Sequence, residues 1–347
     1  MVREGKYLLR VVSIKTITIR KTPKENFMIH TIRTILSVLL LGVIAASQVA
    51  AADNDINQQL NTAIKENNTK AVKDLLYHNQ IDTGIVGKSG KDSLMIAVEA
   101  GNREIISLIL EKGKADINAK TVIGETPLII AAKKGHADIA AFLIKRGANI
   151  HDQTNAGWDA LMIAGRYGKA RVVEKLLSGG AKAKETDKEG NTALMHAALK
   201  GHGGAIKSLV KGGAEVDARN KLDNTALILA VDQGHYRAVD TLLKAGANIE
   251  IRDRFGATPL IISAARRHSS ITSLLLEKGA KVNAYDENGH TALAEASAAG
   301  DEDMADLLLM HGADPDYWQH GVRCSLTPDH PSMSDKRNPC AIRKNEK

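Results

Sequence analysis

The sequence predicts an all-α solenoid, a row of similar helix-turn-helix units in which each unit contacts only its neighbours. Two glycine-containing motifs recur at constant spacing along most of the chain, which is the signature of a repeat architecture. Hydrophobic residues make up 44% of the 347 residues, so a core can be buried, but aromatic residues are only 3%. That is too few for a sandwich or barrel packed around large rings, and two cysteines exclude a disulfide-dense mini-protein.

The first motif is Gly-x-Thr-Pro-Leu or a variant of it. It begins every 33 residues, at Gly124, Gly157, Gly190, Asp223, Gly256 and Gly289. A weaker copy begins 34 residues upstream at Gly90, because the segment 113–115 contains one extra residue. The second motif, Gly-His or a variant, follows eleven residues after the first glycine, as in Gly135-His136.

These motifs predict two helices in each unit. Thr126 is expected to cap the first helix, and Pro127 at its first position loses no hydrogen bond. Gly135 ends that helix, because glycine enters the left-handed region readily. The next apolar run, at 139–143, has helical spacing. Gly147 and the alanine after it end the second helix and lead into an extended turn.

A 33-residue period with these motifs resembles the ankyrin repeat family. The resemblance covers about residues 54–318, and predicts seven repeats at 87–318 behind an N-terminal capping unit at 53–86. It implies a curved stack with β-hairpin fingers along one edge. The capping unit lacks the Gly-x-Thr-Pro-Leu motif, and its first helical stretch is polar on one side, as a terminal unit facing water requires.

Some units depart from the glycine pattern. Asp223 replaces the turn glycine of its unit, and we assign His268 to the inter-helix glycine position of the next one. Asp and His tolerate left-handed backbone better than most residues, so both are expected to fit with small strain. The histidines at one shared repeat position are expected to support turns and not to bind metal; they are His136, His202 and His235.

The N-terminal region has the order of a secretory signal peptide. Arg33 precedes a 12-residue apolar run at 35–46, and small residues precede Asp53. We expect a signal peptide at 28–52 with cleavage after Ala52, or after Ala50 or Ala51. Residues 1–27 are then an over-extended start. The alternative is an uncleaved membrane anchor at 34–52, which is long enough to span a bilayer.

Residues 319–347 are expected to form an irregular C-terminal tail. Its prolines and charged residues favour irregular structure. In an exported protein, Cys324 and Cys340 can close one disulfide. The alternative is a tail with two free thiols.

Charge and motifs exclude several classes of function. The formal net charge is +7, but eight of the 47 Lys and Arg residues and two of the 40 Asp and Glu residues lie in residues 1–52. The remainder has 39 basic and 38 acidic residues, so nucleic-acid binding has no global electrostatic support. No metal-ligand spacing, phosphate-binding loop or nucleophile motif is present. We therefore expect no enzyme activity, no metal and no cofactor.

The resemblance implies that a protein partner binds on a concave face made of the fingertips and the exposed side of each first helix. Aromatic and arginine residues on such a face are the usual anchors of interfaces. The candidate partner-binding residues are Val122, Ile123, Lys133, Lys134, Asn155, Trp158, Arg166, Tyr167, Leu222, Arg254, Phe255, Arg266 and Arg267.

The sequence therefore predicts a monomeric, non-catalytic protein-interaction scaffold in the bacterial periplasm that does not contact the membrane after signal cleavage. Two alternatives are a secreted effector that binds a host protein and a scaffold anchored in the inner membrane. A third is an enzyme whose site lies in the tail.

Overall fold

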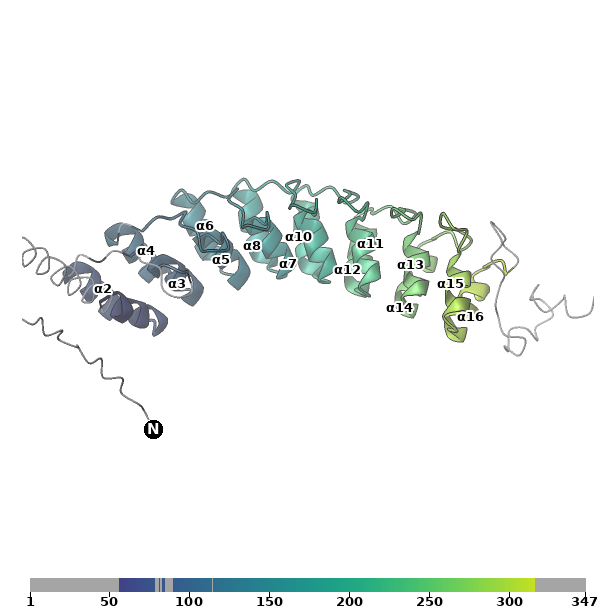
Figure 1. The fold of residues 1–347 in the computed structure, drawn as a ribbon, viewed down its shortest axis with the longest axis horizontal. Coiled ribbons are helices and arrows are strands. Elements are labelled where there is room, and N and C mark those ends of the chain that lie inside the picture. The colour runs from purple at the N-terminus through teal and green to yellow at the C-terminus, as the bar shows by residue number, and fades with distance from the viewer. Residues whose placement is uncertain (1–55, 79–80, 82, 85–89, 114, 316–347) are drawn as a thin grey trace, which may run out of the picture. The chain divides into compact units, whose positions relative to one another are not determined.

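A computed structural model describes residues 56–78, 81, 83–84, 90–113 and 115–315 (Figure 1). These lie almost entirely in the second of two compact units, Met1–Ile56 and Asn57–Lys347. The predicted start (1–27), signal peptide (28–52) and tail (319–347, with Cys324 and Cys340) lie outside the described residues.

The predicted all-α solenoid of helix-turn-helix units is confirmed, and Figure 1 shows the helix pairs side by side in chain order. Residues 56–65 are helical and precede α2 (Thr69–His78). The first helices of the seven repeats are α3 (Ser93–Ala100), α5 (Pro127–Lys134), α7 (Ala160–Arg166), α9 (Ala193–Leu199), α11 (Ala226–Asp232), α13 (Pro259–Ala265) and α15 (Ala292–Ala298). The second helices are α4 (Arg103–Lys112), α6 (Ala137–Lys145), α8 (Ala170–Ser178), α10 (Gly203–Lys211), α12 (Tyr236–Lys244), α14 (Ser269–Glu277) and α16 (Glu302–Met310).

The core runs through the row of first helices. In α5, every residue from Pro127 to Ala132 is buried, whereas α8 buries only Val172, Val173 and Leu176. A first helix inside the row, such as α5, is enclosed by its own second helix and by the first helices of both neighbours. Small residues such as Ala131 and Ala164 permit this close approach. All repeats therefore share one continuous hydrophobic core.

Each first helix begins at a buried cap. Thr126, Thr192, Thr225, Thr258 and Thr291 accept a hydrogen bond from the backbone N–H three residues ahead. Asp92 and Asp159 occupy the same position in the other two repeats. The cap satisfies one of the N–H groups that a helix start leaves unpaired.

The fingers are tight turns at 121–125, 154–158, 187–191, 220–224, 253–257 and 286–290. In each, the first N–H donates to the last C=O, at 3.0–3.1 Å. Described residues outside the helices form no extended strand, and only two isolated antiparallel bridges occur, Thr186–Thr192 and Tyr285–Thr291. The predicted β-hairpin fingers are thus present as tight turns, without paired strands in the described residues.

Adjacent repeats are joined by backbone contacts of the fingers. The N–H of Asn155 donates to the C=O of Ile123 at 3.0 Å, and Glu287 donates to Phe255 at 3.0 Å in the same way. A third bond, from Lys221 to Glu189 at 3.1 Å, gives three such links among the six fingers, and the fingertips in each linked pair are held close together.

The recurring histidines support the turns of the preceding repeat. The Nε2 atom of His136 lies 3.3 Å from the Glu99 carbonyl oxygen, and that of His235 lies 3.1 Å from the Leu199 carbonyl oxygen. His268 makes the same contact with Asp232 at 3.3 Å. This is the expected structural role, with His268 as a further member of the series.

The assignment of His268 to an inter-helix glycine position is wrong by one residue. Arg267 has the left-handed φ of 59°, whereas His268 has a φ of −92° and lies at the start of α14. His268 must occupy the histidine position because its ring contacts the preceding repeat. Asp223 does replace a turn glycine, with a φ of 59°.

We expect Arg267→Gly to raise the free energy of unfolding by about 0.5–1 kcal/mol, because an arginine pays for the left-handed conformation and glycine does not. Its exposed contacts with Ala299 and Asp301 offset little of this gain. Asp223→Gly should raise the free energy of unfolding by less, because Asp adopts the left-handed conformation more readily than Arg does. Urea unfolding of both variants measures the difference, and a larger gain from Asp223→Gly would contradict it.

A second prediction concerns the buried cap of α7. Burial raises the pKa of Asp159, although the N–H groups of Met162 and Leu161 act to lower it. The contribution of this carboxyl group to stability is thus complete below its ordinary pKa and is lost as the pH rises through its folded pKa. Asp159→Thr keeps the cap without the charge. It should therefore stabilise the protein more at about pH 7 than at about pH 3.5.

Thermal unfolding of wild type and variant at both pH values measures this difference. The reverse change, Thr192→Asp, serves as the control and should destabilise the protein more at the higher pH. An Asp159→Thr effect that is the same at both pH values is incompatible with a raised pKa.

Candidate protein-binding face

Most of the strongly exposed apolar side chains lie on the predicted face. Of the eight large ones in the described ranges, five belong to the candidate set, namely Val122 (84% exposed), Ile123 (56%), Tyr167 (44%), Leu222 (50%) and Phe255 (54%). The other three, Tyr77, Tyr236 and Met310, lie on α2, α12 and α16. Large exposed apolar side chains cost hydration free energy, so their concentration marks a candidate contact surface.

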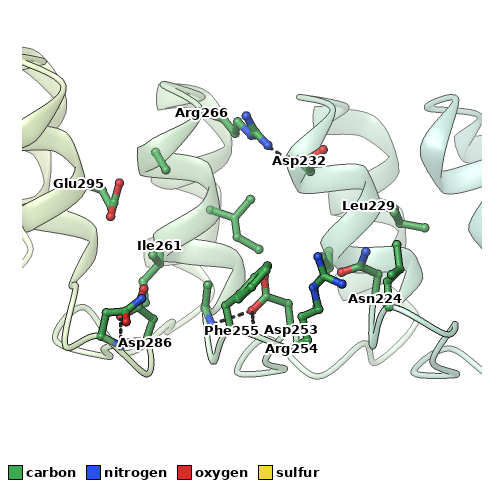
Figure 2. A pocket seen from close by; sticks show the side chains of 16 residues that line it. Asn224, Leu229, Asp232, Asp253, Arg254, Phe255, Ile261, Arg266, Asp286 and Glu295 are labelled. Carbon is green, nitrogen blue, oxygen red and sulfur yellow. Dashed lines mark hydrogen bonds and ion pairs between the residues drawn. The ribbon is translucent and has the colours of Figure 1, made fainter.

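A groove of about 490 Å³, which we call the α13 groove, opens on this face between the fingers and helices α11, α13 and α15 (Figure 2). It brings together four of the candidate residues, Leu222, Arg254, Phe255 and Arg266. It is also lined by Asn224, Ile228, Leu229, Asp232, Asp253, Ala257, Ile261, Ile262, Ala265, Asp286, Asn288 and Glu295.

A second groove of about 400 Å³ lies next to it, around α9, and is bordered by Lys188, Glu189 and Lys221. Both grooves include Leu222, Asn224 and Leu229, so they meet at the finger that carries Leu222. The structure does not place the remaining candidates in either groove. Those residues are Val122, Ile123, Lys133, Lys134, Asn155, Trp158, Arg166, Tyr167 and Arg267.

The basic candidates are largely paired with acids. Lys133 Nζ donates to Glu125 Oε1 at 2.7 Å, and this hydrogen bond raises the pKa of Lys133. Lys134 Nζ lies 2.7 Å from Glu99 Oε1 of the preceding repeat. Hydrogen bonds from Lys134 and then Lys91 lower the pKa of Glu99 to about 2.

Of the candidate arginines, Arg266 is paired with an acid and Arg166 is stacked on an aromatic ring. Arg266 Nε lies 2.8 Å from Asp232 Oδ1 in the preceding repeat (Figure 2). The guanidinium of Arg166 lies 4.9 Å from the ring centroid of Trp158. Most of the basic candidates are thus engaged in ion pairs or stacked on a ring, which leaves few of them free to neutralise a polyanion.

Trp158 is engaged inside the protein more than the sequence suggests. It is half-buried, and its indole Nε1 donates to Asp187 Oδ2 at 3.1 Å. His196 Nε2 lies 2.9 Å from the same oxygen, and the two rings meet edge to face with centroids 5.0 Å apart. Trp158 therefore joins two repeats, so its effect on binding cannot be separated from its effect on packing.

The Asp187–His196 pair was not among the candidates. Burial lowers the pKa of His196 against the opposing effect of Asp187. Burial alone raises the pKa of Asp187, but hydrogen bonds from Asn191 and His196 lower it overall. A neutral histidine thus donates to an ionised carboxylate.

A polar residue at one repeat position is a second feature that sequence reasoning missed. Glu295 in α15 occupies the place held by Leu229 in α11 and Ile262 in α13. Alignment of the repeats shows Glu295 and, in α9, His196 as the polar residues of a position that is otherwise Ile or Leu, but only the structure shows that this position faces a groove.

In the described ranges, no group of three His, Cys, Asp or Glu residues is placed to bind a metal ion. No helix described there combines the length and apolar character needed to cross a bilayer.

Comparison with known proteins identifies the repeats. A family model described as ankyrin repeats (3 copies) matches residues 60–154, 161–253 and 248–317. A putative ankyrin repeat protein of Rickettsia bellii (strain RML369-C) is 34% identical over 106 residues, covering 26% of this chain and 62% of that protein.

Two vertebrate proteins are similar over shorter shares of the chain. Protein phosphatase 1 regulatory subunit 27 of Homo sapiens is 35% identical over 92 residues, covering 26% of this chain and 58% of that protein. The nuclear factor NF-kappa-B p105 subunit of Gallus gallus is 32% identical over 117 residues, covering 34% of this chain and 12% of that protein. The chain thus spans less than two thirds of the length of each of these relatives.

The contacts of Trp158 predict that Trp158→Ala lowers the free energy of unfolding by about 2 kcal/mol, because packing and the bond to Asp187 are both lost. Tyr167→Ala, at an exposed site, should cost no more than about 0.5 kcal/mol. Urea unfolding of the two variants compares them. Equal losses would show that Trp158 is as dispensable to the stack as Tyr167.

Proposed function

Because the chain belongs to the ankyrin repeat family, we propose that it is a non-catalytic, monomeric scaffold whose fingers and first helices bind a protein partner. The observation that carries this proposal is the concentration of exposed apolar side chains on that face. The finger-to-finger hydrogen bonds hold the face in place before binding. A face that is ordered in advance loses little conformational entropy on association, which favours affinity.

The relatives support a role in protein assembly. Two of them are named as subunits, one of NF-kappa-B and one that regulates protein phosphatase 1. Neither name indicates which protein this chain binds, because repeats of one fold carry different contact residues.

We further propose that the scaffold works in the bacterial periplasm after removal of residues 28–52. The support is the order of Arg33, the apolar run and the Ala-x-Ala segment in the sequence. A secreted effector and an inner-membrane anchor are the alternative fates of the same leader. A mature protein whose intact mass corresponds to a start at Asp53, recovered in the periplasmic fraction, distinguishes the proposal from both.

The partner-binding face is tested by capture from an extract of the source cells, with the full chain as bait. The double variant Ile123→Ala/Tyr167→Ala should recover about tenfold less partner, because exposed apolar anchors carry much of the affinity of an interface. Tyr236→Ala is the matched control, since Tyr236 is also 44% exposed but lies on α12.

Quantitative mass spectrometry of the captured proteins gives the readout. Equal recovery with the double variant and with Tyr236→Ala would refute this assignment of the face.

A further inference from the structure

We propose that the α13 groove binds an extended segment of a partner protein in which a Lys or Arg side chain neighbours a large apolar side chain. This inference rests on the proposed function, because it specifies what one part of the partner-binding face accepts.

The apolar half of the groove is built from equivalent positions of successive repeats. Leu222 and Phe255 occupy the same place in adjacent fingers, and each is about half exposed. Behind them, Leu229 and Ile262 share one position of α11 and α13 and are half-buried. An apolar side chain inserted between the two fingertips would remove apolar surface of all four residues from water.

The charged half of the groove is acidic. Its lining contains four carboxylates and two guanidinium groups. Arg266 is paired with Asp232. Arg254 lies over the ring of Phe255, 4.6 Å from the centroid, at the exposed rim. The excess negative charge comes from Asp253, Asp286 and Glu295. Figure 2 shows Asp286 and Glu295 toward α15, and Asp253 beside Phe255 and Arg254.

Two of these carboxylates have a local structural role. Asp253 Oδ1 accepts the N–H groups of Phe255 and Ala257, each at 2.9 Å, and Asp286 Oδ1 does the same in the next finger. They are needed for the turns, so their charge alone does not indicate a ligand.

Glu295 differs from them, because its position requires no acid. The two preceding repeats hold Leu229 and Ile262 there, and the one before them holds His196. Glu295 Oε1 lies 3.0 Å from His290 Nδ1, and no role of its acid group in a turn is seen among the described residues. A carboxylate thus replaces an apolar side chain at the point where the groove faces α15. Charge complementarity selects a cationic group of the partner at this point.

The neighbouring groove favours one direction of the segment, because its border carries two lysines against one acid, Glu189. Lys188 and Lys221 border it on the other side of Leu222. A cation is therefore repelled at the α9 end and attracted at the α15 end, while Leu222 and Phe255 hold the apolar residue between them.

The test is a selection of displayed random linear peptides on the full chain, followed by fluorescence anisotropy of the recovered peptides. Recovered sequences should place Lys or Arg next to Leu, Ile, Met or Phe. Their affinity should fall about tenfold with Phe255→Ala and with Glu295→Gln. Tyr77→Ala, at 53% exposure against 54% for Phe255, is the control and should change nothing.

Glu295→Lys should reverse the preference and recover peptides with Asp or Glu in place of Lys or Arg. Circular dichroism detects any loss of binding that is due to misfolding. Substitution of Glu295 should be tolerated, because the equivalent position holds Leu229 and Ile262 in other repeats. A selection that yields no binder sensitive to Phe255→Ala, or one that yields acidic peptides on the wild type, overturns the proposal.

Two other occupants of the groove are outcomes of the same experiment. Peptide binding that appears only after removal of residues 319–347 would assign the groove to the chain's own tail. A dimer that Phe255→Ala dissociates would assign it to a second copy. Either result overturns the proposal, whereas the proposed function fails only if capture is also insensitive to Ile123→Ala/Tyr167→Ala.

Discussion

Burial of each first helix inside the row between its two neighbours is the constraint on which the rest of the structure depends. A helix such as α5, in which every residue from Pro127 to Ala132 is buried, presents only Lys133 and Lys134 at its C-terminal end to solvent. One repeat alone cannot enclose it, so stability comes from stacking. Small residues and buried caps follow from that requirement, because adjacent first helices approach closely and their N–H groups have no access to water.

The same constraint leaves the fingertips and first-helix ends free to vary. Their backbone is fixed by turn hydrogen bonds and by the bonds between adjacent fingers. Their side chains do not hold the core, so Ile123, Leu222 and Phe255 can be exposed without loss of the fold. A rigid backbone with variable side chains is the arrangement in which a binding surface can be specified by few residues.

Periodicity predicted the fold well because glycine, threonine and leucine end, cap and bury the helices within each repeat. Contacts between side chains of different repeats could not be predicted from the sequence in this way. Nothing in the sequence showed that Trp158 donates to Asp187 or that His196 lies against both, since the three residues belong to two repeats. The shift of His268 by one residue arose because Arg267 is not a residue that left-handed backbone favours. The groove beside Glu295 needed the relative placement of three helices.

The most direct measurement is hydrogen exchange of the full chain with and without its captured partner. The account predicts slower exchange in the fingers and first helices, with α13 and the fingers at 220–224 and 253–257 among them, and no change in the second helices. Protection confined to second helices such as α8 and α12, with the fingers unchanged, would contradict the account.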